Sequence, residues 1–270
     1  MVADIPADWV KAAVAITPGF EVQGDPYQGA SGDFDGMGIS CGALQWNIGK
    51  GSLQPMVKNA GKSNVLAAMP KFGQDMWDAC NTTIAKGLSI VRRWQNGTRL
   101  KPAALTELRG FMGSPAMRAQ QDQRIGKVAD VAFNLASGWA KNRLNGTPTK
   151  RSFCWFFDIA TQNGSLKDLT FADVARFLDQ NKPDRADDVV CDFLGSRTGA
   201  SGHINDAKKN AQLWRNKADG DKLELLVMSY LRSNTADPKW QHVVLNRKGT
   251  IAMGVGWVNS GKNDFAKHGL

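Results

Sequence analysis

The stretch at residues 32–56, GDFDGMGISCGALQWNIGKGSLQPM, combines six glycines and two aspartates with apolar residues. A lone glutamate, Glu21, precedes it, directly after an apolar pattern at 7–16 that has helical spacing and ends at Pro18-Gly19. Glycine, aspartate and serine cluster at 23–38, which predicts turns and short strands. We therefore expect a small glycine-rich β region immediately after the first helix.

Outward from this stretch, the centre of the sequence is mostly helical. Apolar residues recur at spacings of three and four, and Thr170 and Asp221 are candidate N-caps. The predicted helical segments are 51–60, 64–94, 101–113, 114–144, 149–166, 170–181 and 221–234. The C-terminal stretch 239–261 is rich in β-branched residues and glycine, which favours irregular structure or short strands. The fold class is therefore mainly α (α+β).

The length allows one large domain. The chain has 270 residues, 42% of them hydrophobic, which suffices for a sizeable core. It shows no internal repeat, no low-complexity tract and no long linker. The simplest organisation is a single domain over 1–270 with two lobes.

Charge and hydropathy limit the partners. Thirty-four Lys and Arg against twenty-five Asp and Glu give +9, which favours anionic partners such as nucleic acid, an acidic cell wall or a membrane surface. The basic residues are scattered, and no basic-aromatic nucleic-acid motif is present, so nucleic acid is not expected. The sequence has no apolar run long enough for a membrane span and no recognisable signal peptide.

The cysteine and histidine pattern gives no support for a metal site or a cofactor. Four cysteines lie far apart without a Cys-x-x-Cys pair, and the three histidines all lie in the C-terminal quarter. The apolar run around Cys154 predicts a buried free thiol. We expect neither a metal nor a cofactor.

Two carboxylates suit general acid-base chemistry. Glu21 stands between Phe20 and Val22, and an apolar environment raises the pKa of a carboxylic acid so that it can donate a proton. Asp35 lies in a glycine-rich turn, where backbone N–H groups and solvent favour the ionised form. Cleavage of a glycosidic bond needs such a pair. Any chain with this many acidic residues contains similar pairs, so spacing alone does not identify a site.

The glutamate after the first helix, followed by GDFDGMGISCGALQWNIGKGSL, resembles the chitosanases of glycoside hydrolase family 46. The resemblance implies the two-lobed fold of the lysozyme superfamily, with an open groove. By position it implies Glu21 as general acid, Asp35 as general base or ion-pair stabiliser, and Ser40 as the residue that holds the attacking water. Two positions depart from the family: Ser52 replaces an aspartate and Met37 an arginine, which weakens recognition of a cationic sugar.

Further site residues follow from the same resemblance. Gln45, Trp46 and Asn47 are candidate sugar contacts, although a core position for Trp46 stays open because most Trp side chains are buried. A fainter similarity over 115–165 suggests four supporting residues under the groove, while ordinary surface charges and a salt-bridged aspartate remain the alternative. These four residues are Gln120, Asp122, Arg124 and Asp158.

The resemblance also implies a function. The GMGISCGALQW pattern is similar to cell-wall lytic domains of phage lysins and of effectors injected between bacteria. A peptidoglycan hydrolase of lysozyme type is the leading hypothesis, with inversion and carboxyl groups roughly 6.5 to 9.5 Å apart. The enzyme would cut β-1,4 bonds of the bacterial wall, in the periplasm of a target or host cell. Phage lysis or a secretion apparatus would deliver it, and an immunity or inhibitor protein is a candidate partner. A chitosanase, a lytic transglycosylase and a non-catalytic wall-binding or nucleic-acid-binding module are the alternatives.

Overall fold

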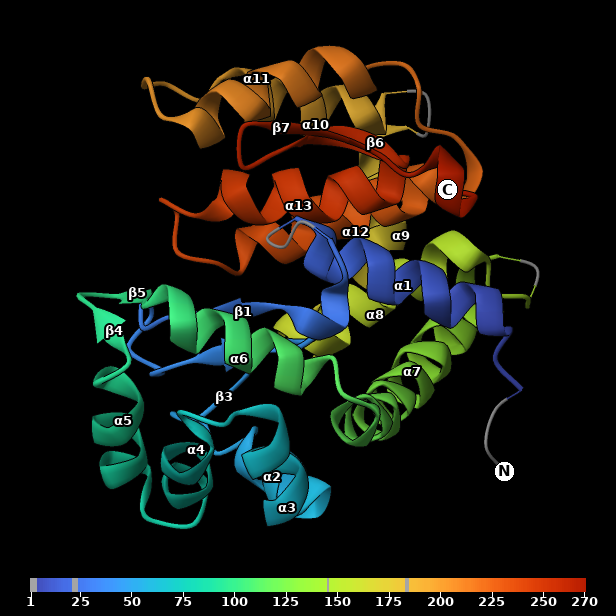
Figure 1. The fold of residues 1–270 in the computed structure, drawn as a ribbon. Helices are drawn as coiled ribbons and strands as arrows, with labels where there is room; N and C mark the ends of the chain where they lie inside the picture. The colour runs from blue at the N-terminus through green and yellow to red at the C-terminus, as the bar shows by residue number, and fades with distance from the viewer. Residues whose placement is uncertain (1–3, 21–23, 145, 183–184) are drawn as a thin grey trace. The chain divides into compact units, whose positions relative to one another are not determined.

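Helices dominate the computed structural model, which describes residues 4–20, 24–144, 146–182 and 185–270 (Figure 1). The described residues form thirteen α-helices and three small antiparallel sheets, so the predicted mainly α (α+β) class is confirmed. The chain divides into two compact units. We call Met1–Phe20 with Val128–Leu270 the first unit and Glu21–Lys127 the second unit.

The second unit contains the glycine-rich stretch and the predicted short strands. Its three-stranded sheet has the order β1-β2-β3, in which Cys41 pairs with both Ala30 and Trp46. Its elements are η1 (Pro26–Gln28), β1 (Ala30–Ser31), β2 (Ser40–Cys41), β3 (Trp46–Asn47), α2 (Gln54–Ala60), α3 (Lys62–Ala68), α4 (Gly73–Cys80), α5 (Ile84–Arg92), β4 (Gln95–Asn96), β5 (Arg99–Leu100), α6 (Pro102–Met112) and the first part of α7 (Pro115–Arg143).

The helical segment predicted at 64–94 is divided among three helices, α3, α4 and α5. Pro70 follows the end of α3, where a missing N–H prevents the helix from continuing. The carboxylate of Glu107 on α6 accepts the N–H groups of Lys71 at 3.1 Å and Phe72 at 3.0 Å, which satisfies backbone donors at this break. Thr83 then caps α5. The apolar spacing continues through all three helices because each buries apolar side chains and packs against the next helix.

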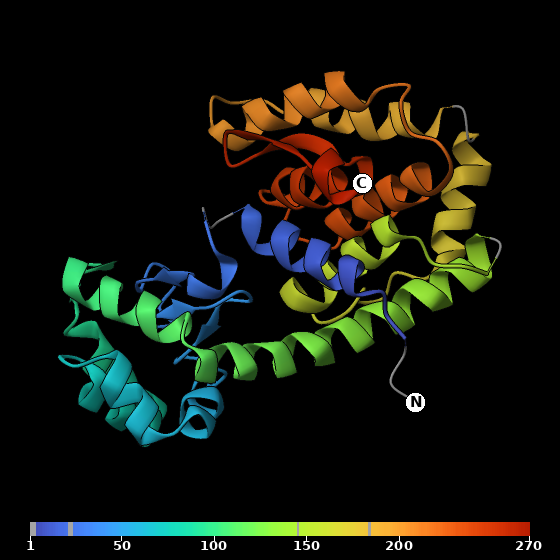
Figure 2. The same ribbon diagram turned by 45° about the vertical axis from the view of Figure 1, so that its right-hand side comes forward.

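The first unit is almost entirely helical. Its elements are α1 (Ala7–Gly19), the remainder of α7, α8 (Lys150–Gln162), α9 (Phe171–Asn181), α10 (Ala186–Gly195), α11 (Gly202–Trp214), α12 (Gly220–Asn234), α13 (Gln241–Met253), β6 (Val255–Val258), β7 (Gly261–Asp264) and η2 (Ala266–His268). Helix α7, which is seen lengthwise in Figure 2, has 29 residues and corresponds to the segment predicted at 114–144.

Local sequence signals determine where several of these helices begin. Thr149 and Thr170 each form a capping box with the residue three positions later, as expected for a threonine N-cap. Between these caps, α8 buries a run of aromatic side chains, and each buried Phe contributes about 1.5–3 kcal/mol of hydrophobic stabilisation. Asp221, predicted as a cap, instead lies in the first turn of α12 and accepts a hydrogen bond from Thr149 at 2.7 Å.

The C-terminal prediction is wrong for residues 241–253, which form helix α13. This helix packs against α8, α11, α12 and β6, and it is buried over most of its length (Figure 1). β-branched residues are acceptable there because tertiary packing outweighs their low helix propensity. Gly249 is required by close approach, since a Cβ atom would lie 2.6 Å from ring carbons of Trp214. The β-rich expectation holds for the hairpin β6–β7 that follows.

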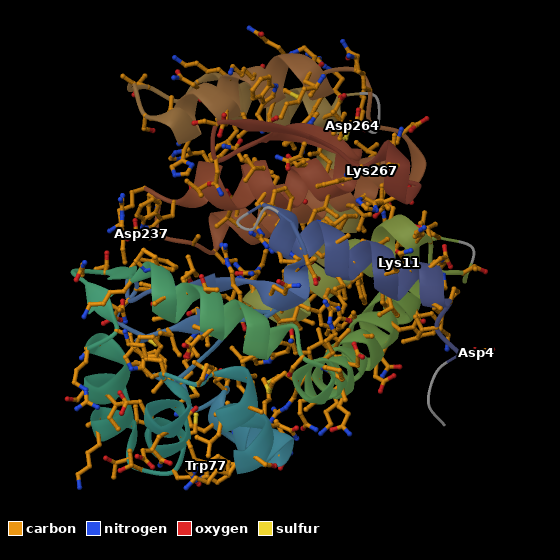
Figure 3. The ribbon with its side chains drawn as sticks, in the orientation of Figure 1. Asp4, Lys11, Trp77, Asp237, Asp264 and Lys267 are labelled. Carbon is orange, nitrogen blue, oxygen red and sulfur yellow. The ribbon has the colours of Figure 1, made fainter. Side chains whose placement is uncertain are left out.

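Several charged side chains of the described residues lie on the surface. Lys11 on α1, Asp237 between α12 and α13, and Lys267 on η2 are exposed (Figure 3). None of the helices in the described part of the chain combines the length and apolar character that a bilayer span requires.

Candidate functional site

Asp35 lies at the tip of the loop between β1 and β2 in the second unit. Its side chain is exposed, and its Oδ1 accepts the N–H of Met37 at 3.1 Å, which forms a tight Asx turn. Asp35 makes no ion pair with any described residue. The carboxylate therefore keeps most of its acceptor capacity for a ligand or a water molecule.

Two side chains from outside the loop hold it in place; we call Arg92 and Gln95 the loop clamp. Arg92 Nε donates to Asp33 Oδ2 at 2.6 Å, and its Nη2 donates to Gly36 O at 3.3 Å. Gln95 Oε1 accepts the N–H of Asp33 at 2.8 Å, and its Nε2 donates to Gly38 O at 2.8 Å. The residues on both sides of Asp35 are thus attached to α5 and β4.

Asp33 is the loop residue that the clamp contacts most, and its side chain also bonds within the loop. Its Oδ1 accepts the N–H of Gly38 at 2.6 Å while its Oδ2 is paired with Arg92. Although burial opposes ionisation, the hydrogen bonds from Arg92 and Gly38 lower the pKa of Asp33. Gly38 adopts φ +84°, and a Cβ atom there would lie 2.7 Å from Leu88, so both its conformation and its space require glycine. Both carboxylate oxygens of Asp33 therefore make contacts that hold the loop, whereas the Asp35 carboxylate accepts only the N–H of Met37 among the described residues.

Ser40 lies five residues beyond Asp35 but in a different environment. It is part of β2 and only 3% exposed, and its carbonyl accepts a hydrogen bond from Ser31 Oγ at 3.4 Å. Its hydroxyl is therefore largely removed from solvent, whereas the Asp35 carboxylate is open to it. The role of Ser40 in holding a water molecule stays a prediction.

The side chains of the three predicted sugar contacts around β3 are buried or half-buried and contact neighbouring parts of the protein. Trp46 is only 8% exposed, and a Cβ atom at Gly42 would lie 2.9 Å from its ring. The structure thus gives Trp46 the core position that was left open. Asn47 Oδ1 accepts the N–H of Lys50 at 2.8 Å in the following turn. Gln45, half-buried at φ +56°, donates to Gly42 O at 3.3 Å.

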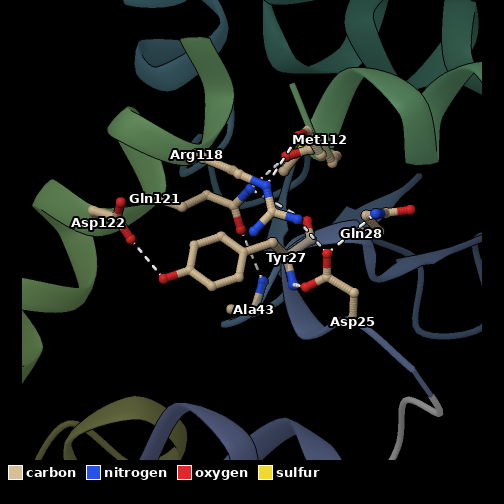
Figure 4. A network of polar contacts seen from close by, with 9 residues as sticks. Asp25, Tyr27, Gln28, Ala43, Met112, Arg118, Gln121 and Asp122 are labelled. Carbon is tan, nitrogen blue, oxygen red and sulfur yellow. Dashed lines mark hydrogen bonds and ion pairs between the residues drawn. The ribbon is translucent and has the colours of Figure 1, made fainter. Parts of the chain in front are cut away.

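Gln121, which was not among the predicted site residues, joins three separate segments of the second unit (Figure 4). Its Oε1 accepts the N–H of Ala43 at 3.0 Å, and its Nε2 donates to Tyr27 O at 3.2 Å and to Met112 O at 2.8 Å. The side chain is fully buried. A signal was available, because Gln121 lies four residues after Met117 and four before Ile125 on the apolar stripe of α7.

The predicted supporting residues on α7 lie beside Gln121 but differ in their contacts. Asp122 Oδ1 accepts the Tyr27 hydroxyl at 2.5 Å, and burial together with this hydrogen bond raises the pKa of Tyr27 to about 12. Arg118, which was not predicted, forms an ion pair with Asp25 and lies 4.8 Å from the Tyr27 ring centroid (Figure 4). The side chains of Gln120 and Arg124 make no hydrogen bond or ion pair with another described residue.

Asp158 belongs to the first unit and lies on α8. It is fully buried, and its carboxylate is paired with Arg247 at 2.8 Å and Lys248 at 2.8 Å, both on α13. Although burial opposes ionisation, these two cations lower the pKa of Asp158 to about 2. Arg247 also donates to Thr17 O at 2.6 Å, so the cluster joins α8 and α13 to the last turn of α1. This arrangement agrees with the alternative of a salt-bridged structural aspartate.

Glu21, the predicted acid, lies outside the described residues. Of the remaining predicted site residues, the second unit holds all except Asp158. Within the described ranges, no group of three or more His, Cys, Asp or Glu side chains is placed to bind a metal ion. All four cysteines are buried as free thiols, as the sequence predicted for Cys154.

Comparison with known proteins adds no assignment, because no protein family matches the chain and no curated protein is significantly similar to it.

Proposed function

We propose that this protein is a lysozyme-like glycoside hydrolase that cleaves β-1,4 bonds in the glycan strands of peptidoglycan. Glu21 would protonate the leaving oxygen. Asp35 would accept a proton from a water molecule that attacks the anomeric carbon from the opposite face, which inverts its configuration. Neither step needs a cofactor.

The observation that carries the proposal is an exposed carboxylate on a clamped loop. An exposed aspartate in a turn is ordinary, but Asp35 is flanked by residues tied to Arg92 and Gln95. A general base must keep a defined position relative to the bond it acts on, and errors of about 1 Å can cost about 100-fold in rate. The clamp supplies this position without occupying the Asp35 carboxylate.

Charge supports an anionic glycan over chitosan. The net charge of +9 favours a polymer that carries carboxylates and disfavours a polycation. The position of the family's ammonium-binding aspartate is held by Ser52, whose Oγ accepts the N–H of Asn47 at 2.9 Å in a turn. Peptidoglycan, with its lactyl and peptide carboxylates, fits these properties.

The site of action would be the bacterial wall, reached by phage lysis or a secretion apparatus. An immunity or inhibitor protein is a candidate partner.

The test is digestion of purified peptidoglycan with the wild type, Glu21→Gln, Asp35→Asn and Asp78→Asn. Asp78 is a matched control, because it is exposed in the same unit and accepts one side-chain hydrogen bond, from Gln74. Mass spectrometry should find fragments with reducing ends from the wild type and from Asp78→Asn only.

Other results would favour other functions. Anhydro-sugar products together with an active Asp35→Asn variant would indicate a lytic transglycosylase. Cleavage of chitosan without release from peptidoglycan would indicate a chitosanase. Binding to peptidoglycan without cleavage of either polymer would indicate a wall-binding module and would refute the hydrolase proposal.

A further inference from the structure

Phe34, the residue before Asp35, has an unusual exposure. Its side chain is 69% exposed, more than any other large apolar side chain in the described part of the chain. The other large apolar side chains that are exposed range from 38% for Leu66 to 52% for Trp240. Full burial of a Phe side chain contributes about 1.5–3 kcal/mol of hydrophobic stabilisation, and most of this contribution is absent at Phe34 because its side chain is exposed.

The exposure of Phe34 does not come from a loosely held loop. The preceding residue, Asp33, is bonded through its backbone N–H to Gln95 and through its carboxylate to Arg92. The carbonyl of Gly36, two residues later, accepts a hydrogen bond from Arg92 at 3.3 Å. The same clamp therefore restrains the loop at Asp33 and Gly36, on either side of Phe34 and Asp35.

The space beside the loop tip is open. A Cβ atom added at Gly36 would meet no atom within 4 Å, so a ligand could approach the backbone there closely. The loop tip thus offers an aromatic ring, a carboxylate and bare glycine backbone in consecutive positions. Ligand sites commonly combine an aromatic surface with a small number of placed polar groups in this way.

We propose that Phe34 is a sugar-stacking residue that packs against the apolar face of a pyranose ring next to the bond served by Asp35. This inference rests on the proposed function and adds a specificity-determining residue to it. Phe34 and Asp35 are consecutive, with Cα atoms about 3.8 Å apart, and both side chains are exposed, so the proposal assigns the ring and the carboxylate to the same or adjoining sugar units. The C–H groups on a pyranose face carry partial positive charge, which complements the negative face of an aromatic ring.

The alternative is that Phe34 is an isolated exposed apolar residue, which is common on protein surfaces. Ile84 provides the comparison, because it is 45% exposed in the same unit and lies at the start of α5, away from the loop tip. A non-specific apolar effect would change equally when either side chain is shortened. A stacking residue would also tolerate replacement by another aromatic ring.

The experiment measures glycan binding separately from cleavage. The Asp35→Asn protein, combined with Phe34→Ala, Phe34→Trp or Ile84→Ala, is titrated calorimetrically with solubilised peptidoglycan glycan strands and with N-acetylglucosamine hexasaccharide. Phe34→Ala should weaken binding about tenfold, equivalent to about 1.4 kcal/mol, while Phe34→Trp and Ile84→Ala should bind as the parent does. In the otherwise unmodified protein, Phe34→Ala should raise KM more than it lowers kcat.

The outcomes separate this inference from the proposed function. Equal binding by Phe34→Ala and Ile84→Ala, with peptidoglycan still cleaved by the wild type, would overturn the stacking role and leave the hydrolase intact. Neither binding nor cleavage of any glycan by the wild type would overturn both. Loss of binding in Phe34→Trp as well as in Phe34→Ala would also count against stacking, because the aromatic ring would then be insufficient.

Discussion

Replacement of Gln121 by Met tests whether one buried amide holds the second unit together. The Gln121 side chain makes three hydrogen bonds to backbone groups, at Ala43, Tyr27 and Met112. Met has nearly the same length and volume, so the change removes these bonds without opening a large cavity. It isolates the polar contribution of the side chain.

The expected loss of stability follows from the number of bonds. Each buried hydrogen bond contributes about 1 kcal/mol net, so the loss of all three should lower the free energy of unfolding by about 3 kcal/mol. The partner groups would be left without their bonds, and each buried unsatisfied group costs about 1–3 kcal/mol, so the estimate is a lower one.

The assay is urea denaturation of Gln121→Met beside Gln120→Met, with hydrogen exchange at the Ala43 amide as a local readout. Gln120 is the adjacent residue on α7 and makes no side-chain hydrogen bond with another described residue, so its replacement should change stability by no more than about 0.5 kcal/mol. The Ala43 amide should lose protection only in Gln121→Met. Equal unfolding free energies for the two variants, with Ala43 still protected, would refute the reasoning.

The pKa of Asp158 falls from 3.8 to about 2 on folding, so its ionised carboxylate stabilises the folded protein above about pH 4. About 2 kcal/mol of the free energy of unfolding should be lost as the pH falls from 3.8 towards 2. In Asp158→Asn this part of the acid dependence of unfolding should be absent. Gly249→Ala should lower the melting temperature through a clash with Trp214, at a cost of about 1–3 kcal/mol, while Gly126→Ala, where a Cβ atom meets nothing within 4 Å, should not lower it. For the proposed hydrolase activity, Arg92→Gln should release the Asp35 loop and lower kcat on peptidoglycan about tenfold or more with little change in KM, whereas the neighbouring Arg93→Gln should leave both constants unchanged. Burial raises the pKa of every cysteine, to about 12 for Cys80, Cys154 and Cys191, so iodoacetamide should label these thiols only after denaturation, and rapid native labelling detected by mass spectrometry would contradict the described packing.

The candidate site was only partly predictable from the sequence. Asp35 was a candidate because its glycine-rich loop resembles the chitosanase motif, and the structure places it on an exposed turn. The clamp residues Arg92 and Gln95 were not identified, because they lie about sixty positions away from the loop and nothing local marks them as its partners. The supporting residues predicted on α7 from the family resemblance include both neighbours of Gln121, Gln120 and Asp122, but not Gln121 itself.

The sequence by itself determined the helical class, the helices α7 and α8 and the capped helix α9, because apolar spacing and the Thr170 cap act within a few residues. Tertiary structure decided the features that depend on distant partners. Helix α13 forms from β-branched residues because it is packed by α8, α11, α12 and β6. Asp158 becomes a buried ion-pair partner only where α13 brings Arg247 and Lys248 to it, and Trp46 becomes a core residue only where Gly42 makes room for its ring. Local patterns specify elements, whereas the role of a polar or aromatic side chain depends on which remote groups share its surroundings.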